Sequence, residues 1–224
     1  MIEQFARLIP RNLLDESGSV FYSGRNAFSK PNNLYILGLN PGGEPNDRKD
    51  DSIRLDTEEI LRGRPDNWSE YRDGEWENKP PGKHGMQPRI LHLLRKLNLD
   101  PGTVPASNIA FLRSSQEKSF KGDIYAIAEE CWPLHQAVIS ELGVTVILCF
   151  GRTAGAWVRY KVGADKKISE FVEKNKRKWR SKIYTNSNDI LVADFTHPSR
   201  ANWVAPDTDP SELMLDIVSE LTSR

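Results

Sequence analysis

The sequence predicts an α/β fold: a single domain, built as a three-layer α/β/α sandwich around a central, mainly parallel, four-stranded sheet. Short apolar runs, typical of buried strands, alternate along the chain with segments that carry a helical apolar stripe. The chain has 224 residues, of which 38% are hydrophobic and 28% are charged, so it has a globular composition and enough length for one substantial core. We therefore expect residues 1–224 to form one domain.

Four short apolar runs, each bounded by turn-forming residues, are the expected strands. The run that ends at Phe150 is continuous, which is typical of a parallel strand covered on both faces. The expected strands cover residues 34–37, 108–112, 144–150 and 190–193.

Helical apolar stripes lie between these runs. Proline removes a backbone donor, so we expect Pro133 to separate two helices. Ser211 is expected to cap the closing helix. The expected helices cover residues 2–14, 56–61, 88–97, 123–131, 133–142 and 211–221, with a further helix starting after Gly151.

A long polar insertion at about 43–86 interrupts the alternation. It is dense in charge, glycine and proline, and its isolated aromatic residues include Trp68, Tyr71 and Trp76. A segment of this length with little apolar periodicity is usually functional, mobile, or both.

Composition argues against a membrane protein, a secreted protein and a metalloprotein. No apolar run approaches the ~20 residues of a membrane span, and the N-terminus lacks a secretory signal, so we expect a cytoplasmic protein with no membrane partner. The two cysteines, Cys131 and Cys149, suit a reducing compartment and cannot supply the four thiolates of an iron–sulfur cluster. His84, His92 and His135 show no metal-like spacing, so we expect no metal and no cofactor. A net charge of zero neither supports nor excludes a nucleic-acid partner.

Two short polar segments directly follow expected strands. The first is Gly-Leu-Asn-Pro-Gly at 38–42, and the second is Thr-His-Pro-Ser-Arg at 196–200. In an open α/β sheet, ligands bind where parallel strands end. We therefore expect Asn40 and His197 to lie at one edge of the sheet and to carry the chemistry.

Taken together, in this order and this far apart, the two segments resemble the active-site motifs of the uracil-DNA glycosylase superfamily. In that superfamily a GxNPG-type loop carries the residue that positions a water, and an HPS-type loop carries a histidine that stabilises the departing base. The resemblance implies that Asn40 and His197 are catalytic. Residues 146–154 also look like the third strand and the Gly-x-x-Ala helix start that are common in the superfamily.

The hydrolysis of an N-glycosidic bond suits these residue types. Asn40 offers both an acceptor and a donor, so it can orient a water without being a strong base. His197 would donate an N–H toward a base carbonyl, and loss of one such donor typically costs ~2.7–4 kcal/mol in the barrier. Either segment alone would favour the simpler interpretation, a turn for Asn-Pro-Gly and a strand exit for His-Pro-Ser.

The resemblance also implies residues that bind the base and the DNA. Asn108 stands where the superfamily often places the asparagine that reads the pyrimidine edge; otherwise it is a turn asparagine. Arg200 is the candidate for insertion or phosphate binding, while Trp203 favours packing. Lys176 and Lys178 bind phosphates or belong to a solvated face. The expected base-binding residues are Gly38, Leu39, Pro41, Gly42 and Asn108, and the expected DNA-binding residues are Ser199, Arg200, Arg152, Lys176 and Lys178.

The segment after the first motif departs from the uracil-specific pattern. A base-stacking aromatic is expected there, but residues 43–47 contain none, and the next aromatic is Trp68. Glu44 and Asp47 are candidates for assisting the water, or they line a polar loop. The altered loop indicates a substrate that is uracil or a modified pyrimidine such as those in phage DNA.

We therefore expect a monofunctional DNA glycosylase that flips out a base and leaves an abasic site, in repair or in anti-phage defence. Neither motif carries a lysine, so no Schiff-base lyase step is expected. The expected partner is DNA, and we expect a monomer. Two alternatives stay open: a catalytically inactive DNA-binding member of the superfamily, and a hydrolase of free nucleosides or nucleotides.

Overall fold

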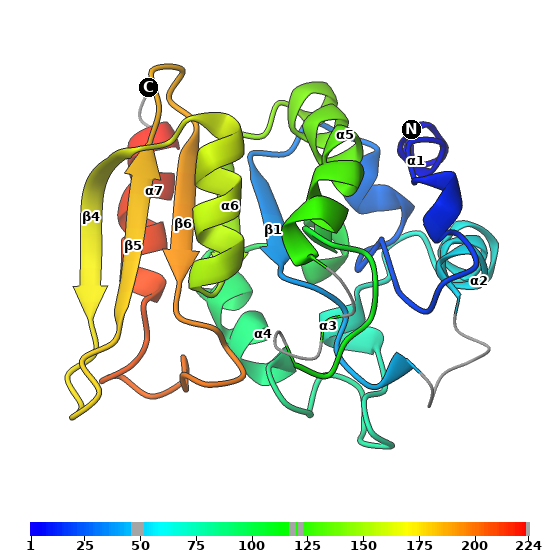
Figure 1. Cartoon of the computed structure of the whole chain (residues 1–224). Coiled ribbons are helices and arrows are strands. Elements are labelled where there is room, and N and C mark those ends of the chain that lie inside the picture. The colour runs from blue at the N-terminus through cyan, green and yellow to red at the C-terminus, as the bar shows by residue number, and fades with distance from the viewer. Residues whose placement is uncertain (46–51, 117–119, 121–122, 223–224) are drawn as a thin grey trace. The chain divides into compact units, whose positions relative to one another are not determined.

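The computed structural model describes residues 1–45, 52–116, 120 and 123–222 (Figure 1). The chain forms two compact units, and each is assembled from two stretches. Unit 1 contains Met1–Trp68 and Gly102–Thr145, and unit 2 contains Ser69–Pro101 and Val146–Arg224. The first motif, with Asn40, belongs to unit 1, and the second motif, with His197, belongs to unit 2.

Two parallel strands form the sheet of unit 1, β1 (Leu34–Gly38) and β2 (Ala106–Asn108). Every residue of both strands is buried, as their apolar or small side chains favour. The register pairs Gly38 with Asn108, so the last residues of the two strands are neighbours. This pair links the first motif directly to the predicted base-reading asparagine.

The N-terminal helix is shorter than predicted. α1 covers Ile2–Ala6, and the chain then forms a turn and a 3₁₀ segment at Arg11–Leu13. Pro10 explains the early end, because proline has no N–H to donate to the carbonyl of the preceding turn. The next helix, α2 (Ile53–Glu58), is capped by the side chain of Ser52 and continues as a π-helical turn.

α5 (Ile124–Leu142) is one continuous helix, so the predicted break at Pro133 was wrong. An interior proline costs ~3 kcal/mol or more in helix stability. Here one buried stripe continues across it, with Cys131 before the proline and Leu134 and His135 after it. Burial of that stripe outweighs the lost backbone hydrogen bond.

Unit 2 contains four strands in the order β3-β6-β5-β4. β3 and β6 are parallel, whereas β5 pairs antiparallel with both β6 and β4. Their bounds are β3 Val146–Phe150, β4 Lys166–Val172, β5 Arg180–Thr185 and β6 Leu191–Phe195.

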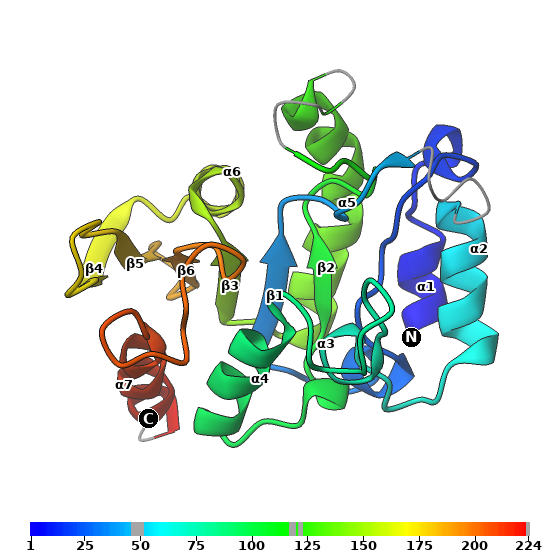
Figure 2. The ribbon, with the colours of Figure 1, turned by 90° about the horizontal axis from the view of Figure 1, so that it is seen from below.

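Helices cover both faces of the unit 2 strands. α6 lies on one face and α7 on the opposite face (Figures 1 and 2). α4 packs beside α7, and the short α3 packs on α4. Their bounds are α3 Glu70–Asp73, α4 Gln87–Lys96, α6 Arg152–Val162 and α7 Ser211–Thr222.

The mixed α/β class is confirmed, but the described residues form six strands rather than the predicted four. The two additional strands are β4 and β5, which form a hairpin in a basic stretch where the sequence predicted no strand. In β5 the buried Ser181 and Ile183 alternate with charged or half-buried side chains, a period-2 pattern that the surrounding lysines and arginines obscure.

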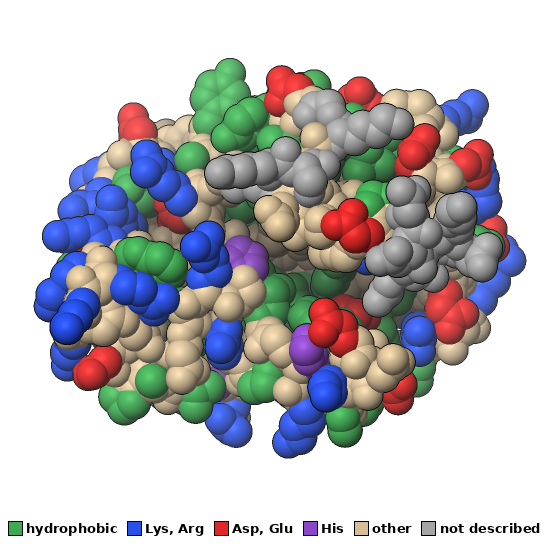
Figure 3. Space-filling model, turned by 60° about the horizontal axis from the view of Figure 1, so that its bottom comes forward, with side chains coloured by type: hydrophobic (Ala, Val, Ile, Leu, Met, Phe, Trp, Pro, Cys, Tyr) green, Lys and Arg blue, Asp and Glu red, His purple; other side chains and the backbone are tan. Residues whose placement is uncertain are grey.

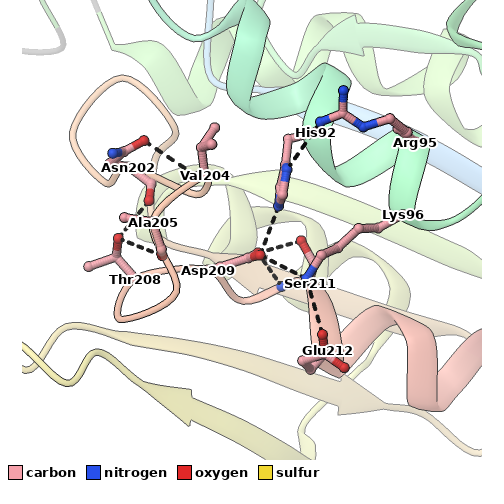
Figure 4. Close-up of polar contacts among 10 residues, drawn as sticks. All are labelled: His92, Arg95, Lys96, Asn202, Val204, Ala205, Thr208, Asp209, Ser211 and Glu212. Atoms are coloured by element: carbon pink, nitrogen blue, oxygen red, sulfur yellow. Dashed lines mark hydrogen bonds and ion pairs between the residues drawn. The ribbon is translucent and has the colours of Figure 1, made fainter.

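A buried carboxylate joins α4 to the start of α7 (Figure 4). Asp209 accepts hydrogen bonds from His92 Nε2 at 2.8 Å and from the Ser211 N–H at 2.9 Å, and Lys96 Nζ lies 3.0 Å away. Burial raises the pKa of Asp209, but the hydrogen bonds from Ser211, His92 and Lys96 outweigh burial and leave that pKa below its usual value. His92 is therefore a structural residue that anchors α4.

No helix in the described part of the chain is both long and apolar enough to cross a membrane. Cys131 and Cys149 are both buried and unpaired.

Candidate active site

The first motif continues from β1 into a loop that its neighbour strand holds in place. The carbonyl of Gly38 accepts the N–H of Ile109 at 2.9 Å, and the carbonyl of Leu39 accepts the N–H of Ala110 at 3.0 Å. The ladder between the two strands therefore extends past the end of β1. Asn40 directly follows these two hydrogen-bonded residues, so the position of its backbone is restrained.

The side chain of Asn40 is oriented by two backbone carbonyls. Its Nδ2 donates to the carbonyl of Pro41 at 2.8 Å and to the carbonyl of Ser114 at 3.1 Å. Both amide hydrogens are thereby used, and no described residue donates to Oδ1. The half-buried Asn40 thus presents a fixed acceptor, the group needed to orient a water.

Two residues that sequence reasoning missed brace this loop. The Ser114 N–H donates to the carbonyl of Pro41 at 3.0 Å, and Arg113 donates to the carbonyl of Gly42 at 2.6 Å. Pro41 is buried, whereas Gly42 is exposed. The only sequence signal for Arg113 and Ser114 was their position shortly after the second expected strand.

Asn108 lies beside the motif with an unpaired donor. Its side chain is 5% exposed, and its Nδ2 is buried without a hydrogen-bond partner. Its Oδ1 packs against Gly38, and a Cβ atom added at position 38 would lie 2.1 Å from that oxygen. Gly38 is therefore required as glycine to leave room for the Asn108 carboxamide, a contact that no sequence pattern reveals.

In unit 2, the second motif fixes the tautomer of His197. The Ser199 N–H donates to His197 Nδ1 at 3.1 Å, and the Ser199 hydroxyl lies 2.8 Å from the same atom. Because Nδ1 is an acceptor, the proton of a neutral imidazole is on Nε2. Ser199, predicted to bind DNA, thus positions His197 through both of its donors.

His197 is held in the neutral form. Burial, followed by the positive charge of Arg200, lowers its pKa from 6.5 to about 4. Its ring meets Phe150 edge-on with centroids 6.3 Å apart, and Gly151, at a φ of +88°, brings the backbone close to the ring. At neutral pH the group available to a ligand is therefore a neutral N–H donor.

The backbone of the second motif is braced on both sides. Trp203 is fully buried and donates its indole N–H to the carbonyl of Thr196 at 3.1 Å, which confirms that it packs. Arg89, on α4, donates to the carbonyl of Pro198. The Arg200 N–H closes a turn onto the carbonyl of His197 at 2.9 Å. α4, anchored through Asp209, thus helps to hold the loop of the second motif.

The predicted DNA-binding residues of unit 2 are exposed. Arg200 extends from the second motif, Arg152 begins α6, and Lys176 and Lys178 lie in the connection between β4 and β5. Their exposure is compatible with phosphate contacts, and their role stays a prediction.

The polar insertion supplies few groups to the first motif. Glu44 is exposed, and Asp47 lies outside the described residues. Trp68 and Tyr71 are 6% and 2% exposed, so both are packing residues in their own units. Trp76 is half-buried and donates its indole N–H to Glu70.

The described residues contain no group of three or more His, Cys, Asp or Glu side chains arranged to hold a metal ion. No protein-family model matches this chain, and no curated protein matches it either.

Proposed function

We propose that this protein is a monofunctional DNA glycosylase of the uracil-DNA glycosylase type. The observation that carries the proposal is the buried, unpaired Nδ2 of Asn108 beside the first motif. An unsatisfied buried donor costs ~1–3 kcal/mol of stability, so its presence favours a ligand that supplies an acceptor. A pyrimidine carbonyl or ring nitrogen is such an acceptor.

In the proposed reaction the bond between the sugar C1′ and the base nitrogen breaks, and its electron pair leaves with the base. His197 Nε2–H donates a hydrogen bond to the base oxygen on which negative charge develops. A water oriented by Asn40 Oδ1 attacks C1′ and releases a proton to solvent, and the departing base anion takes up a proton from solvent. The products are a free base and an abasic site, and the proposal requires Asn40 and His197 to act on the same nucleotide.

The proposed substrate is uracil or a modified pyrimidine. Asn108 alone does not choose between them, because a carboxamide presents a donor and an acceptor that match either pyrimidine edge. The described residues that follow the first motif, Gly43 to Pro45, include no aromatic ring to stack on the base. The absence of a ring there favours a pocket that accepts more than plain uracil, in repair or in anti-phage defence.

A glycosylase assay tests the proposal. Oligonucleotides with uracil and genomic DNAs with hypermodified phage cytosines are incubated with the protein, and abasic sites are scored by alkaline cleavage. We expect Asn40→Ala and His197→Ala each to lower the rate by about 10²–10³-fold. Asn12→Ala and His84→Ala, which change the same residue types outside both motifs, serve as matched controls.

A double variant shows whether the two residues serve one step. Residues that act as a unit are strongly non-additive, so Asn40→Ala/His197→Ala should be little slower than the slower single variant. Wild-type silence on every DNA, with cleavage of free nucleosides instead, would refute the proposal. DNA binding that survives Asn40→Ala with no wild-type excision would indicate an inactive DNA-binding protein.

A further inference from the structure

The connection between β4 and β5 in unit 2 is a concentrated basic surface. Residues 174–182 contain six lysines or arginines and no acidic residue. Figure 3 shows Lys and Arg side chains gathered over this end of the hairpin. Lys174, Lys176, Arg177 and Lys178 are all exposed. We call Lys174, Lys176, Lys178 and Arg200 the basic tip.

The cations of this hairpin differ in their ion-pair partners. Along the strands, Lys167 and Arg180 both pair with Glu170, at 3.3 Å and 2.6 Å. At the basic tip, no carboxylate of the described residues lies within ion-pair distance of any of the four cations. An ordinary solvated face interleaves its charges, whereas the basic tip places like charges together, and that arrangement favours an anionic partner.

Arg177 connects the β4–β5 connection to the end of the second motif. Arg177 forms an ion pair with the buried carboxylate of Glu173 at 3.1 Å and donates to the carbonyl of Arg200 at 2.8 Å. Asn175 donates to the same carboxylate at 2.8 Å. Arg177 therefore serves the structure rather than a ligand, because its donors hold the tip against the end of the second motif.

The indole ring of Trp179 makes cation–π contacts with the guanidinium groups of Arg177 and Arg200. The Arg177 Cζ atom lies 4.2 Å from the ring centroid, and the Arg200 Cζ atom lies 5.6 Å from it. Stacking on an aromatic ring limits the freedom of a guanidinium without neutralising its charge. Arg200 is thus an exposed, oriented cation three residues after His197.

We propose that the basic tip binds the phosphates of the DNA strand that carries the target nucleotide. This inference rests on the proposed function and adds which surface holds the DNA strand. A free nucleoside offers no phosphate to four cations, whereas a DNA strand offers a row of them and releases its condensed counterions on binding. In this proposal the basic tip holds the strand while His197 contacts the displaced base.

The test measures DNA binding without requiring excision. The probe is a labelled duplex with one tetrahydrofuran abasic analogue, titrated by fluorescence anisotropy between 50 and 200 mM salt. The test variant is Lys176→Ala/Lys178→Ala. The matched control is Lys166→Ala/Lys167→Ala, which removes the same charge from the far end of the β4–β5 hairpin. Circular dichroism confirms that both variants fold.

Each lost phosphate contact lowers the slope of log K against log salt by about 0.9. We therefore expect the test variant to lose about 2 units of slope and the control to keep the wild-type slope. Arg200→Ala should lose about one unit. A test variant with the wild-type slope, an equal loss in the control, or tighter wild-type binding to an RNA duplex of the same sequence would overturn the proposal.

The two proposals fail in different ways. A protein that excises bases with an unchanged slope in the test variant contradicts only the strand-binding surface. A protein that binds DNA through the basic tip but excises no base contradicts only the glycosylase.

Discussion

Replacing Gly38 with alanine tests the link between the first motif and Asn108. The new Cβ would lie 2.1 Å from Asn108 Oδ1, whereas ordinary contact begins at 3.4 Å, so the oxygen must retreat by about 1.3 Å. Asn108 is buried at the end of β2, where such overpacking costs ~1–3 kcal/mol of unfolding free energy. A misplacement of ~1 Å also lowers catalysis by up to about 10²-fold, so we expect excision to fall by that factor.

The decisive assay is a double-mutant cycle on unfolding free energy, measured with urea at pH 7. In the wild-type background Gly38→Ala should destabilise by ~1–3 kcal/mol. In an Asn108→Ala background the space is vacant, so the same change should be neutral or stabilise by up to ~1 kcal/mol through the unfolded chain. Gly42→Ala, whose Cβ would meet nothing within 4 Å, is the control within the same motif.

The outcome that refutes this reasoning is an equal cost of Gly38→Ala in both backgrounds. The strain would then arise in the strand backbone and not from the Asn108 carboxamide. This result does not depend on knowing the substrate, because stability alone reports it.

Three further predictions concern two histidines, His135 and His197, and the hydrogen bonds to His197. The excision rate per folded molecule should stay nearly constant from pH 7 to pH 5, because His197, with its pKa of about 4, stays neutral over that range. The rate should fall near pH 4, because protonation of Nδ1 breaks the hydrogen bonds from Ser199 that orient the ring. A rate that rises on acidification through pH 6.5 would show an imidazolium donor instead. Ser199→Ala should slow excision about three- to tenfold, since one of two donors to Nδ1 is lost, and a loss as large as that of His197→Ala would contradict this. Buried His135, whose pKa is lowered to about 4 by burial, takes up its proton more readily unfolded, so this histidine alone should lower stability by about 2 kcal/mol between pH 7 and pH 5. Urea unfolding of His135→Phe should show a smaller acid-induced loss than the wild type.

Continuous apolar runs made some elements predictable. β1 and β3 are buried throughout and β6 contains buried apolar residues, so the positions of these strands follow from apolar runs in the sequence. The β4–β5 hairpin was missed because its charged side chains point to solvent along an edge, where burial leaves little apolar signal. The predicted helix break at Pro133 was wrong because packing along the whole length of α5 outweighs the local effect of the proline.

The candidate site was predictable in its residues but not in its internal contacts. The positions of Asn40 and His197 after strands can be read from the chain. The carbonyl of Ser114 that orients Asn40 depends on strand register. The backbone N–H of Ser199 that sets the tautomer of His197 depends on the turn after Pro198. Such contacts depend on distances of a few tenths of an ångström, which spacing along a sequence does not determine.

Gly38 and Asn108 are unfavourable choices for a structural strand pair. Glycine inside a strand costs ~0.5–1 kcal/mol relative to alanine, and the unpaired Asn108 donor costs ~1–3 kcal/mol more. An alanine opposite a valine would fill the same register position without either penalty. Glycine at position 38 leaves room for the carboxamide, and under the proposed function a base acceptor supplies the missing hydrogen bond. The energetic cost of this pair is therefore an argument for the proposed base-binding role of Asn108.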